Sequence, residues 1–242
     1  MPENGLQTRR GFIAILLALG WHISHRLRPY MERSTLKKAL IVWGGWEGHS
    51  PKAVADILAG LLRKNDFEVT ISDTLDAYKD LNLNDFNLIV PNWTMGTITD
   101  EQLKPLLAAV NSGVGLAGLH GGMCDSFRNS PDYQFMTGGQ WVAHPGNDGV
   151  DYMVYIDGAK SPITDGLTDF AVKSEQYYMH VDPVNTVLAT TRFGDLAMPV
   201  VWTKMWGAGR VFYSSLGHTP AIVQMPQTLT LMERGMLWAA RD

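Results

Sequence analysis

The stretch Gly118-Leu119-His120-Gly121-Gly122 decides the fold of this chain. It ends an apolar run that begins at Val114, and a continuous apolar run is typical of a strand buried on both faces of a parallel sheet. The two glycines permit a tight turn. We therefore expect a central strand that ends sharply, with the side chain of His120 projecting from its end.

The sequence before this turn alternates between strand and helix patterns. Further strands are predicted over Ala39–Trp43, Phe67–Ile71 and Leu88–Val90. One helix is predicted after Ser50, which can cap it, and another follows the capping box at Thr99 and runs to about Ser112. This alternation implies βαβ units with right-handed crossovers and a doubly wound, mostly parallel sheet.

The second half of the chain is rich in strand patterns. They cover Tyr152–Ile156, Val187–Thr191, Val200–Trp202 and Arg210–Ser215, and a helix near Gln227–Ala240 closes the chain. We expect these strands to complete the sheet, so residues 35–242 are predicted to form one three-layer α/β domain. Ligands of such folds bind at the carboxyl edge of the sheet, which should carry His49, Trp93 and His120.

Composition excludes several classes of function. The 242 residues are 45% hydrophobic and 18% charged, as in an ordinary globular protein. The formal net charge of -4 provides no basic field, so nucleic-acid binding is not expected. Cys124 is the single cysteine, which excludes an intrachain disulfide and a cysteine-based zinc site.

Residues 1–34 are predicted to be an extension separate from the domain. The apolar run Gly11–Trp21 is shorter than the roughly 20 residues of a membrane-spanning helix, so no stable membrane span is expected. With Arg9 and Arg10 before it, the run resembles a twin-arginine export signal. Another explanation is that Met31 is the true initiator. A cytoplasmic protein is the first prediction, and export through this signal is the alternative.

Five separated motifs resemble those of a known family. They are Gly118–Gly122, Gly138–Pro145, Ser174–Tyr178, Pro199–Trp202 and Gly209–His218. With these motifs in order, residues 37–242 resemble the ThuA-like (trehalose utilisation) family, a relative of the class I glutamine amidotransferases. The resemblance implies an amidotransferase-like, flavodoxin-like fold and a link to trehalose or related disaccharides, including 3-keto sugars.

Glutaminase chemistry is not expected. The turn at His120 looks like the nucleophile elbow of class I amidotransferases, but histidine stands where a cysteine would attack. The only thiol, Cys124, lies four residues further on and should point elsewhere.

Five of the seven histidines lie in the predicted domain. The loop after the first strand, the glycine turn and the loop after a late strand meet in this fold, so His49, His120 and His218 are expected to share one pocket. His144 and His180 are weaker candidates, because His144 can simply shape a turn and His180 can satisfy the core.

Two chemistries fit these histidines. Neutral imidazoles of His49, His120 and His218 could hold a divalent metal such as zinc, with Glu175 as fourth ligand or outer partner. Alternatively, His120 or His218 transfers protons directly, oriented by Glu175, and these three are the predicted catalytic residues. The spacing matches no local zinc signature, so the metal cofactor is a hypothesis.

Aromatic residues beside the same loops favour a sugar ligand, because their faces can stack on a pyranose. Trp46 and Trp93 are the predicted pocket walls, and His49, His144 and Tyr177 complete the predicted substrate-binding set.

Two further patterns give only weak indications of function. Asp125 and Arg128 are interpreted as a solvated helix face, with hydroxyl binding as the alternative. Gly44-Gly45-x-x-Gly48 does not have the G-x-G-x-x-G spacing of a dinucleotide site.

The sequence thus predicts an enzyme that acts on a disaccharide or keto-sugar through acid–base or metal-assisted chemistry. The alternative is a non-catalytic sugar-binding or regulatory protein on the same scaffold. A small sugar is the expected ligand, and a homo-oligomer is left open.

Overall fold

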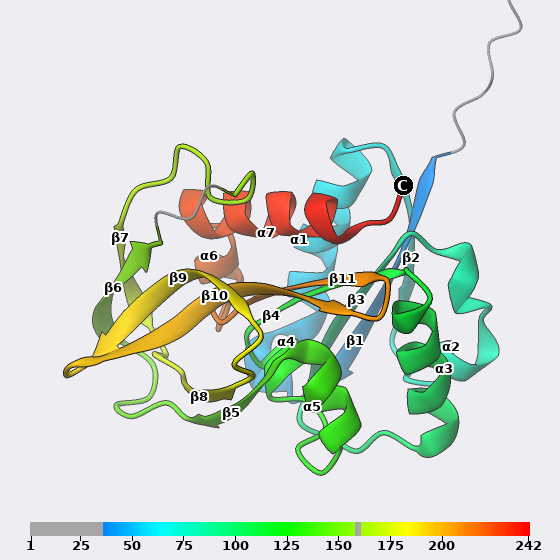
Figure 1. Ribbon diagram of the computed structural model, residues 1–242, viewed down its shortest axis with the longest axis horizontal. Helices are drawn as coiled ribbons and strands as arrows, with labels where there is room; N and C mark the ends of the chain where they lie inside the picture. The colour runs from blue at the N-terminus through cyan, green and yellow to red at the C-terminus, as the bar shows by residue number, and fades with distance from the viewer. Residues whose placement is uncertain (1–35, 158–160) are drawn as a thin grey trace, which may run out of the picture. The chain divides into compact units, whose positions relative to one another are not determined.

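The computed structural model describes residues 36–157 and 161–242. The predicted extension, residues 1–34, lies outside the described residues. The described chain forms one nine-stranded sheet with helices on both faces, and a separate two-stranded sheet (Figure 1). Among the described residues, no helix is both long and apolar enough to cross a membrane.

Half of the large sheet is parallel and has a flavodoxin-like strand order. The order is β2-β1-β3-β4-β11, and all neighbouring strands pair in parallel. These strands are β1 (Lys37–Gly45), β2 (Phe67–Ser72), β3 (Leu88–Thr94), β4 (Gly115–Leu119) and β11 (Gly209–Ser214). Their carboxyl ends therefore meet at one edge, as the βαβ pattern predicts.

Strands of the second half continue the sheet beyond β11 with antiparallel pairing. They are β10 (Leu196–Trp206), β9 (Thr186–Phe193), β6 (Val150–Ile156) and β7 (Phe170–Ser174). The small sheet pairs β5 (Gly139–Ala143) with β8 (Tyr178–Val181). The sequence analysis missed β5 and β7, because strands of five residues give too short a pattern to read.

Two apolar clusters, one on each face of the sheet, make the fold three-layered. One cluster holds residues of α1 (Pro51–Lys64), α6 (Pro220–Val223) and α7 (Pro226–Ala239). The other holds residues of α2 (Ala77–Asp80), α3 (Asp100–Asn111) and α5 (Pro131–Thr137). Short helical turns complete the chain: η1 (Glu47–His49), η2 (Leu83–Asp85) and α4 (His120–Cys124).

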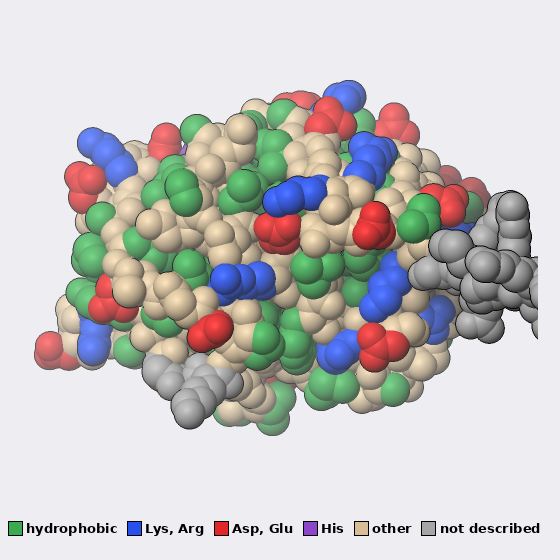
Figure 2. Space-filling view, turned by 90° about the horizontal axis from the view of Figure 1, so that it is seen from above, with side chains coloured by type: hydrophobic (Ala, Val, Ile, Leu, Met, Phe, Trp, Pro, Cys, Tyr) green, Lys and Arg blue, Asp and Glu red, His purple; other side chains and the backbone are tan. Residues whose placement is uncertain are grey.

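The surface carries a mixture of charges. On the face shown in Figure 2, Lys and Arg side chains alternate with Asp and Glu side chains. That face therefore offers no basic patch of the kind that binds phosphate backbones.

Strand β3 is longer than the predicted Leu88–Val90. It continues through Pro91 and pairs with β1 up to Thr94. Its pairing with β4 is confined to Leu88 and Ile89, and proline has no N–H to donate to a ladder. The sheet thus separates between β3 and β4 near its carboxyl edge, where α4 packs.

Of the two predicted helix N-terminal caps, one is confirmed and the other is wrong. At α3, the Thr99 N–H donates to Gln102 Oε1 at 3.0 Å, as the capping box predicts. At α1, Ser50 precedes the helix, but its side chain makes no capping hydrogen bond, so that prediction is wrong. The reason is its left-handed backbone, with φ of 48°.

Gly122 of α4 packs against the backbone of β3. A Cβ there would lie 2.9 Å from Asn92 Cα and 2.6 Å from Asn92 Oδ1. We expect Gly122→Ala to lower the free energy of unfolding by about 1–3 kcal/mol, because β3 or α4 would have to move. Urea unfolding followed by circular dichroism measures the change.

Gly60 provides the matched control. It lies in α1, is exposed, and a Cβ added there meets nothing within 4 Å. Gly60→Ala should therefore raise the free energy of unfolding by about 0.5–1 kcal/mol. Equal effects of the two substitutions would contradict the close packing of α4 on β3.

Candidate functional site

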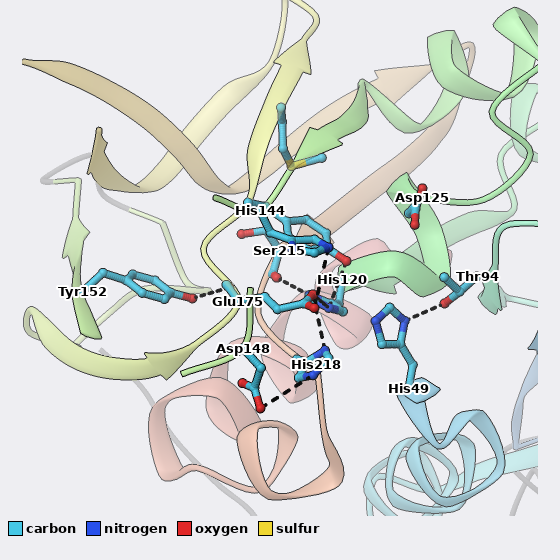
Figure 3. Close-up of polar contacts among 12 residues, drawn as sticks. His49, Thr94, His120, Asp125, His144, Asp148, Tyr152, Glu175, Ser215 and His218 are labelled. Atoms are coloured by element: carbon cyan, nitrogen blue, oxygen red, sulfur yellow. Dashed lines mark hydrogen bonds and ion pairs between the residues drawn. The ribbon is translucent and has the colours of Figure 1, made fainter. Parts of the chain in front are cut away.

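Three histidines from distant parts of the chain meet at the carboxyl edge of the sheet (Figure 3). His49 lies in η1 after β1, His120 begins α4 after β4, and His218 follows β11. The centroid of the His49 ring lies 4.6 Å from that of His120 and 5.2 Å from that of His218. The convergence expected from the order of the strands is therefore present.

His120 is presented by a strained turn. Its backbone is left-handed, with φ of 47°, a conformation that costs a non-glycine residue energy. The Tyr213 hydroxyl donates to the His120 carbonyl at 3.0 Å and helps to hold the turn. Gly121 must remain small, because a Cβ there would lie 2.7 Å from His49 Cε1.

Glu175 brings a carboxylate to the histidines from the segment between β7 and β8. Its Oε2 lies 3.2 Å from His120 Nε2 and 3.3 Å from His218 Nδ1. The Tyr152 hydroxyl donates to its backbone carbonyl at 3.1 Å. Burial alone would raise the pKa of the Glu175 carboxyl, but the contacts with His120 and His218 outweigh it and hold the pKa well below its usual range. The carboxyl is therefore ionised.

The imidazoles differ in their affinity for protons. Burial and the neighbouring rings of His120 and His218 lower the pKa of His49 to about 3. Burial also lowers the pKa of His120, whereas the adjacent Glu175 carboxylate raises the pKa of His218. At neutral pH, His49 and His120 are therefore neutral and able to act as bases or ligands.

Each of the three rings has a polar partner on its outer side. His120 Nδ1 lies 2.8 Å from the carbonyl oxygen of Ser215, and His49 Nδ1 lies 2.9 Å from Thr94 Oγ1. His218 Nε2 lies 3.9 Å from Asp148 Oδ2. The two hydrogen-bond contacts orient the rings of His120 and His49 so that one nitrogen of each is left for the centre of the group.

The site opens into a cavity of about 450 Å³, within the range of about 300–1,000 Å³ of small-molecule pockets. Its walls include most of the residues predicted to bind substrate or metal: Trp46, His49, His144, Tyr177 and His218. Further lining residues are Met95, Asp125, Arg128, Trp141, Asn147, Asp148 and Glu175.

Trp93 does not line this cavity, which corrects the prediction that it forms a pocket wall. It lies within β3, where successive side chains point to opposite faces. Its neighbour Thr94 contacts His49, and the Trp93 ring instead covers Gly44, whose added Cβ would lie 2.5 Å from that ring. Trp141 lines the cavity.

Tyr177 and His144 extend the group into the cavity. The Tyr177 hydroxyl lies 2.9 Å from His120 Nε2, and the two rings stack with centroids 4.1 Å apart. Burial raises the pKa of Tyr177 well above its usual value, so the phenol keeps its proton. His144 Nε2 lies 3.7 Å from Glu175 Oε1. His180 is exposed in β8, away from this group, so it does not satisfy the core as suggested.

Asp125 does not belong to a solvated helix face, which corrects that part of the interpretation, whereas Arg128 is exposed. Asp125 is buried, and its two carboxylate oxygens accept from Arg128 Nε at 2.6 Å and Nη2 at 3.0 Å. Helix α4 ends at Cys124, before either residue. Sequence periodicity has no meaning over so short a helix, so no pattern could have revealed the pair.

Other contacts of the site were also missed by the sequence analysis. Thr94, Asp148 and Tyr152 act on the histidines or on Glu175 from segments that carry no motif. Ser215 acts through its backbone carbonyl, which any residue would supply.

Cys124 is buried, and burial raises the pKa of its thiol above the ordinary value. The thiolate fraction of the folded protein is therefore far below that of the unfolded chain at pH 8. We expect a thiol reagent such as DTNB to react at least about 100-fold more slowly with native protein than with denatured protein. Denaturation should then release one thiol per chain. Rapid stoichiometric labelling of the native protein would contradict this placement.

Comparisons with known proteins agree with the fold. The family model ThuA, described as trehalose utilisation, matches residues 38–239. A search of curated proteins found no match.

Similar solved structures include two ThuA-like proteins. The one from Parabacteroides merdae is 17% identical, with 85% of this chain and 90% of that chain covered and a TM-score of 0.71. The one from Bacteroides uniformis is 18% identical, with 84% and 91% covered and a TM-score of 0.70. A β-galactosidase from Bacillus circulans sp. alkalophilus is 12% identical, with 84% of this chain but 30% of that chain covered and a TM-score of 0.54.

At these identities the structural likeness shows the fold alone. The family match, however, extends over almost all of the described chain. This chain therefore belongs to the ThuA family, whose role is trehalose utilisation.

Proposed function

We propose that this protein is an enzyme of sugar metabolism that binds a divalent metal ion, zinc first, through His49, His120, Glu175 and His218. Each of the four side chains offers one ligand atom, and these atoms all lie within 4.8 Å of one another. Three imidazoles and one carboxylate are a donor set that zinc commonly takes. Of the two roles that the sequence left open for Glu175, fourth ligand or outer partner, the proposal takes the first.

The spacing of the ligand atoms suits such an ion. Ligands 2.0–2.1 Å from a tetrahedral zinc ion lie roughly 3.4 Å from one another. The carboxylate of Glu175 is already 3.2 Å from His120 Nε2 and 3.3 Å from His218 Nδ1. Small side-chain movements would therefore bring the four atoms to coordination distance.

The orientation of His120 is the observation that carries the proposal. Its Nδ1 faces the Ser215 carbonyl, which can only accept, so Nδ1 holds the single proton of the neutral ring. Nε2 then presents a lone pair to Glu175 Oε2 at 3.2 Å. The Tyr177 hydroxyl, 2.9 Å from Nε2, can donate to this lone pair, but attraction between Nε2 and the carboxylate itself requires a cation shared by the two atoms. A metal ion supplies that charge, and protonation of the ring is the alternative.

The outer contacts support the same assignment. A metal-binding histidine usually donates its second nitrogen to a carbonyl, hydroxyl or carboxylate group, which fixes the ring. Ser215 and Thr94 occupy these positions for His120 and His49, whereas Asp148, 3.9 Å from His218 Nε2, lies beyond hydrogen-bond distance.

With the sugar oxygen as a fifth ligand, a bound divalent ion would polarise a carbonyl or hydroxyl group of the substrate. His144 lines the cavity and is not among the metal ligands, so it remains free to move protons beside the ion. A glycosidase mechanism without metal needs two free carboxyl groups; Asp125 is paired with Arg128 and Glu175 with His120 and His218, which leaves Asp148 alone among the carboxyl groups of the lining. Metal-assisted proton transfer on a keto-sugar or disaccharide therefore fits these residues best.

Metal binding is tested on full-length protein purified without chelators. We expect about one zinc per chain by elemental analysis. His120→Ala should weaken zinc binding at least about ten-fold in a competition titration, because one ligand is lost. His180→Ala is the matched control, since His180 is exposed and outside the group, and it should leave the affinity unchanged. A stoichiometry near zero in wild-type protein, with no binding of added zinc, manganese or cobalt, would refute the metal site.

Catalysis is tested by incubating the protein with trehalose and with 3-keto-trehalose, with and without divalent metals. The proposal expects metal-dependent turnover that His120→Ala abolishes. Sugar binding without turnover, unaffected by metals, would instead support the non-catalytic alternative. Turnover that survives both metal removal and His120→Ala would contradict the assigned roles.

A further inference from the structure

One wall of the cavity is built from an ion pair on an aromatic face. Arg128 and Asp125 form a two-point salt bridge, with donor–acceptor distances of 2.6 and 3.0 Å. The guanidinium carbon of Arg128 lies 4.4 Å from the centre of the Trp141 ring. Figure 3 shows Asp125 beyond the end of α4, apart from the group around Glu175. This wall is therefore distinct from the proposed metal ligands.

The charge of this wall is balanced. Arg128 is the single lysine or arginine among the described residues that line the cavity. Asp125, which is 4% exposed, neutralises it within the protein. The remaining charged side chains of the lining, Glu175 and Asp148, are acidic. A phosphate group entering this cavity would meet an exposed Arg128 whose charge Asp125 already balances, so its binding would leave the buried carboxylate beside a second anion.

The same pair is well suited to hydroxyl groups. A guanidinium has five N–H donors, and the salt bridge uses two nitrogens, so donors remain for a ligand. Each carboxylate oxygen has a further lone pair that can accept from a hydroxyl. The pair thus presents donors and acceptors side by side, as the neighbouring hydroxyls of a sugar require.

The aromatic part of this wall has an unsatisfied donor as well. The Trp141 indole N–H is buried and has no hydrogen-bond partner among the described residues. A buried N–H without a partner costs free energy, and a small rotation of the ring would turn it toward a ligand hydroxyl.

We propose that Asp125 and Arg128 form the subsite that binds the hydroxyl groups of an unphosphorylated sugar, and that Asp125 is the residue that excludes phosphorylated sugars. The inference rests on the proposed function, since it assumes that the cavity binds sugar. It also implies that the reaction supplying the substrate leaves the sugar uncharged and is not a phosphoryl transfer.

The charge balance makes Asp125→Asn the informative substitution. Asparagine has nearly the same shape but no charge, so Arg128 would be free to pair with a phosphate. Binding of trehalose, trehalose 6-phosphate and inorganic phosphate is measured by calorimetry on full-length wild type and variant, both metal-free and zinc-loaded. Wild type should prefer the uncharged sugar. In Asp125→Asn, the affinity ratio of phosphorylated to uncharged sugar should rise at least about ten-fold.

Arg128→Met provides a second, independent test of the subsite. It removes the donors while keeping much of the apolar stem over Trp141, so it should weaken binding of the uncharged sugar and leave phosphate binding low. Circular dichroism and thermal unfolding check that each variant is folded. If Asp125→Asn does not fold, the Arg128→Met result decides alone.

An unchanged ratio in folded Asp125→Asn, a wild type that prefers the phosphorylated sugar, or full sugar affinity in Arg128→Met would each overturn the inference. The assay needs neither turnover nor bound metal. If the wild type neither binds metal nor converts sugar, but Asp125→Asn still shifts the ligand preference toward phosphorylated sugar, the proposed enzyme is refuted and the subsite is supported. Metal-dependent turnover, together with an unchanged ligand preference in Asp125→Asn, would support the proposed enzyme and refute the subsite.

Discussion

A buried carboxylate must be compensated, and Glu175 is compensated only because four segments far apart in the chain end at one place. Its Oε2 lies beside His120 and His218, and His144 approaches its other oxygen. Burial of an unpaired carboxylate would cost several kcal/mol. The positions of the loops after β4, β5 and β11 are therefore coupled, because each contributes a ring to the same charge. The cavity forms around this coupled group.

Two backbone features make room for the group. At Pro91, strand β3 stays paired with β1 while its pairing with β4 has already ended, and α4 occupies the opening. At His120, a left-handed residue turns the chain from β4 into α4 and directs the imidazole toward His49. An imidazole at this position can bind a cation or carry a proton.

Some residues of the site could be predicted from the sequence and others could not, and the reason differs from residue to residue. His49, His120 and His218 could be brought together because parallel strands have a common carboxyl edge. Trp93 was misplaced because the strand was predicted to end at Val90, whereas it continues to Thr94. Asp125 and Arg128 were misread because α4 has only five residues and gives no periodicity. Glu175 was recognised through a motif, but its distance from the imidazoles depends on the antiparallel extension and on the small sheet.

The amino-acid sequence by itself determined the α/β class, the order of the early elements and the edge at which the histidines end. These follow from apolar periodicity and from glycine and proline positions, which act over a few residues. Only the tertiary structure decided which ring nitrogen faces the carboxylate, that Arg128 is neutralised by Asp125, and that Trp141 lines the cavity while Trp93 does not. Such contacts depend on distances of a few ångströms between segments that are far apart in the chain, and no local pattern in the sequence encodes them.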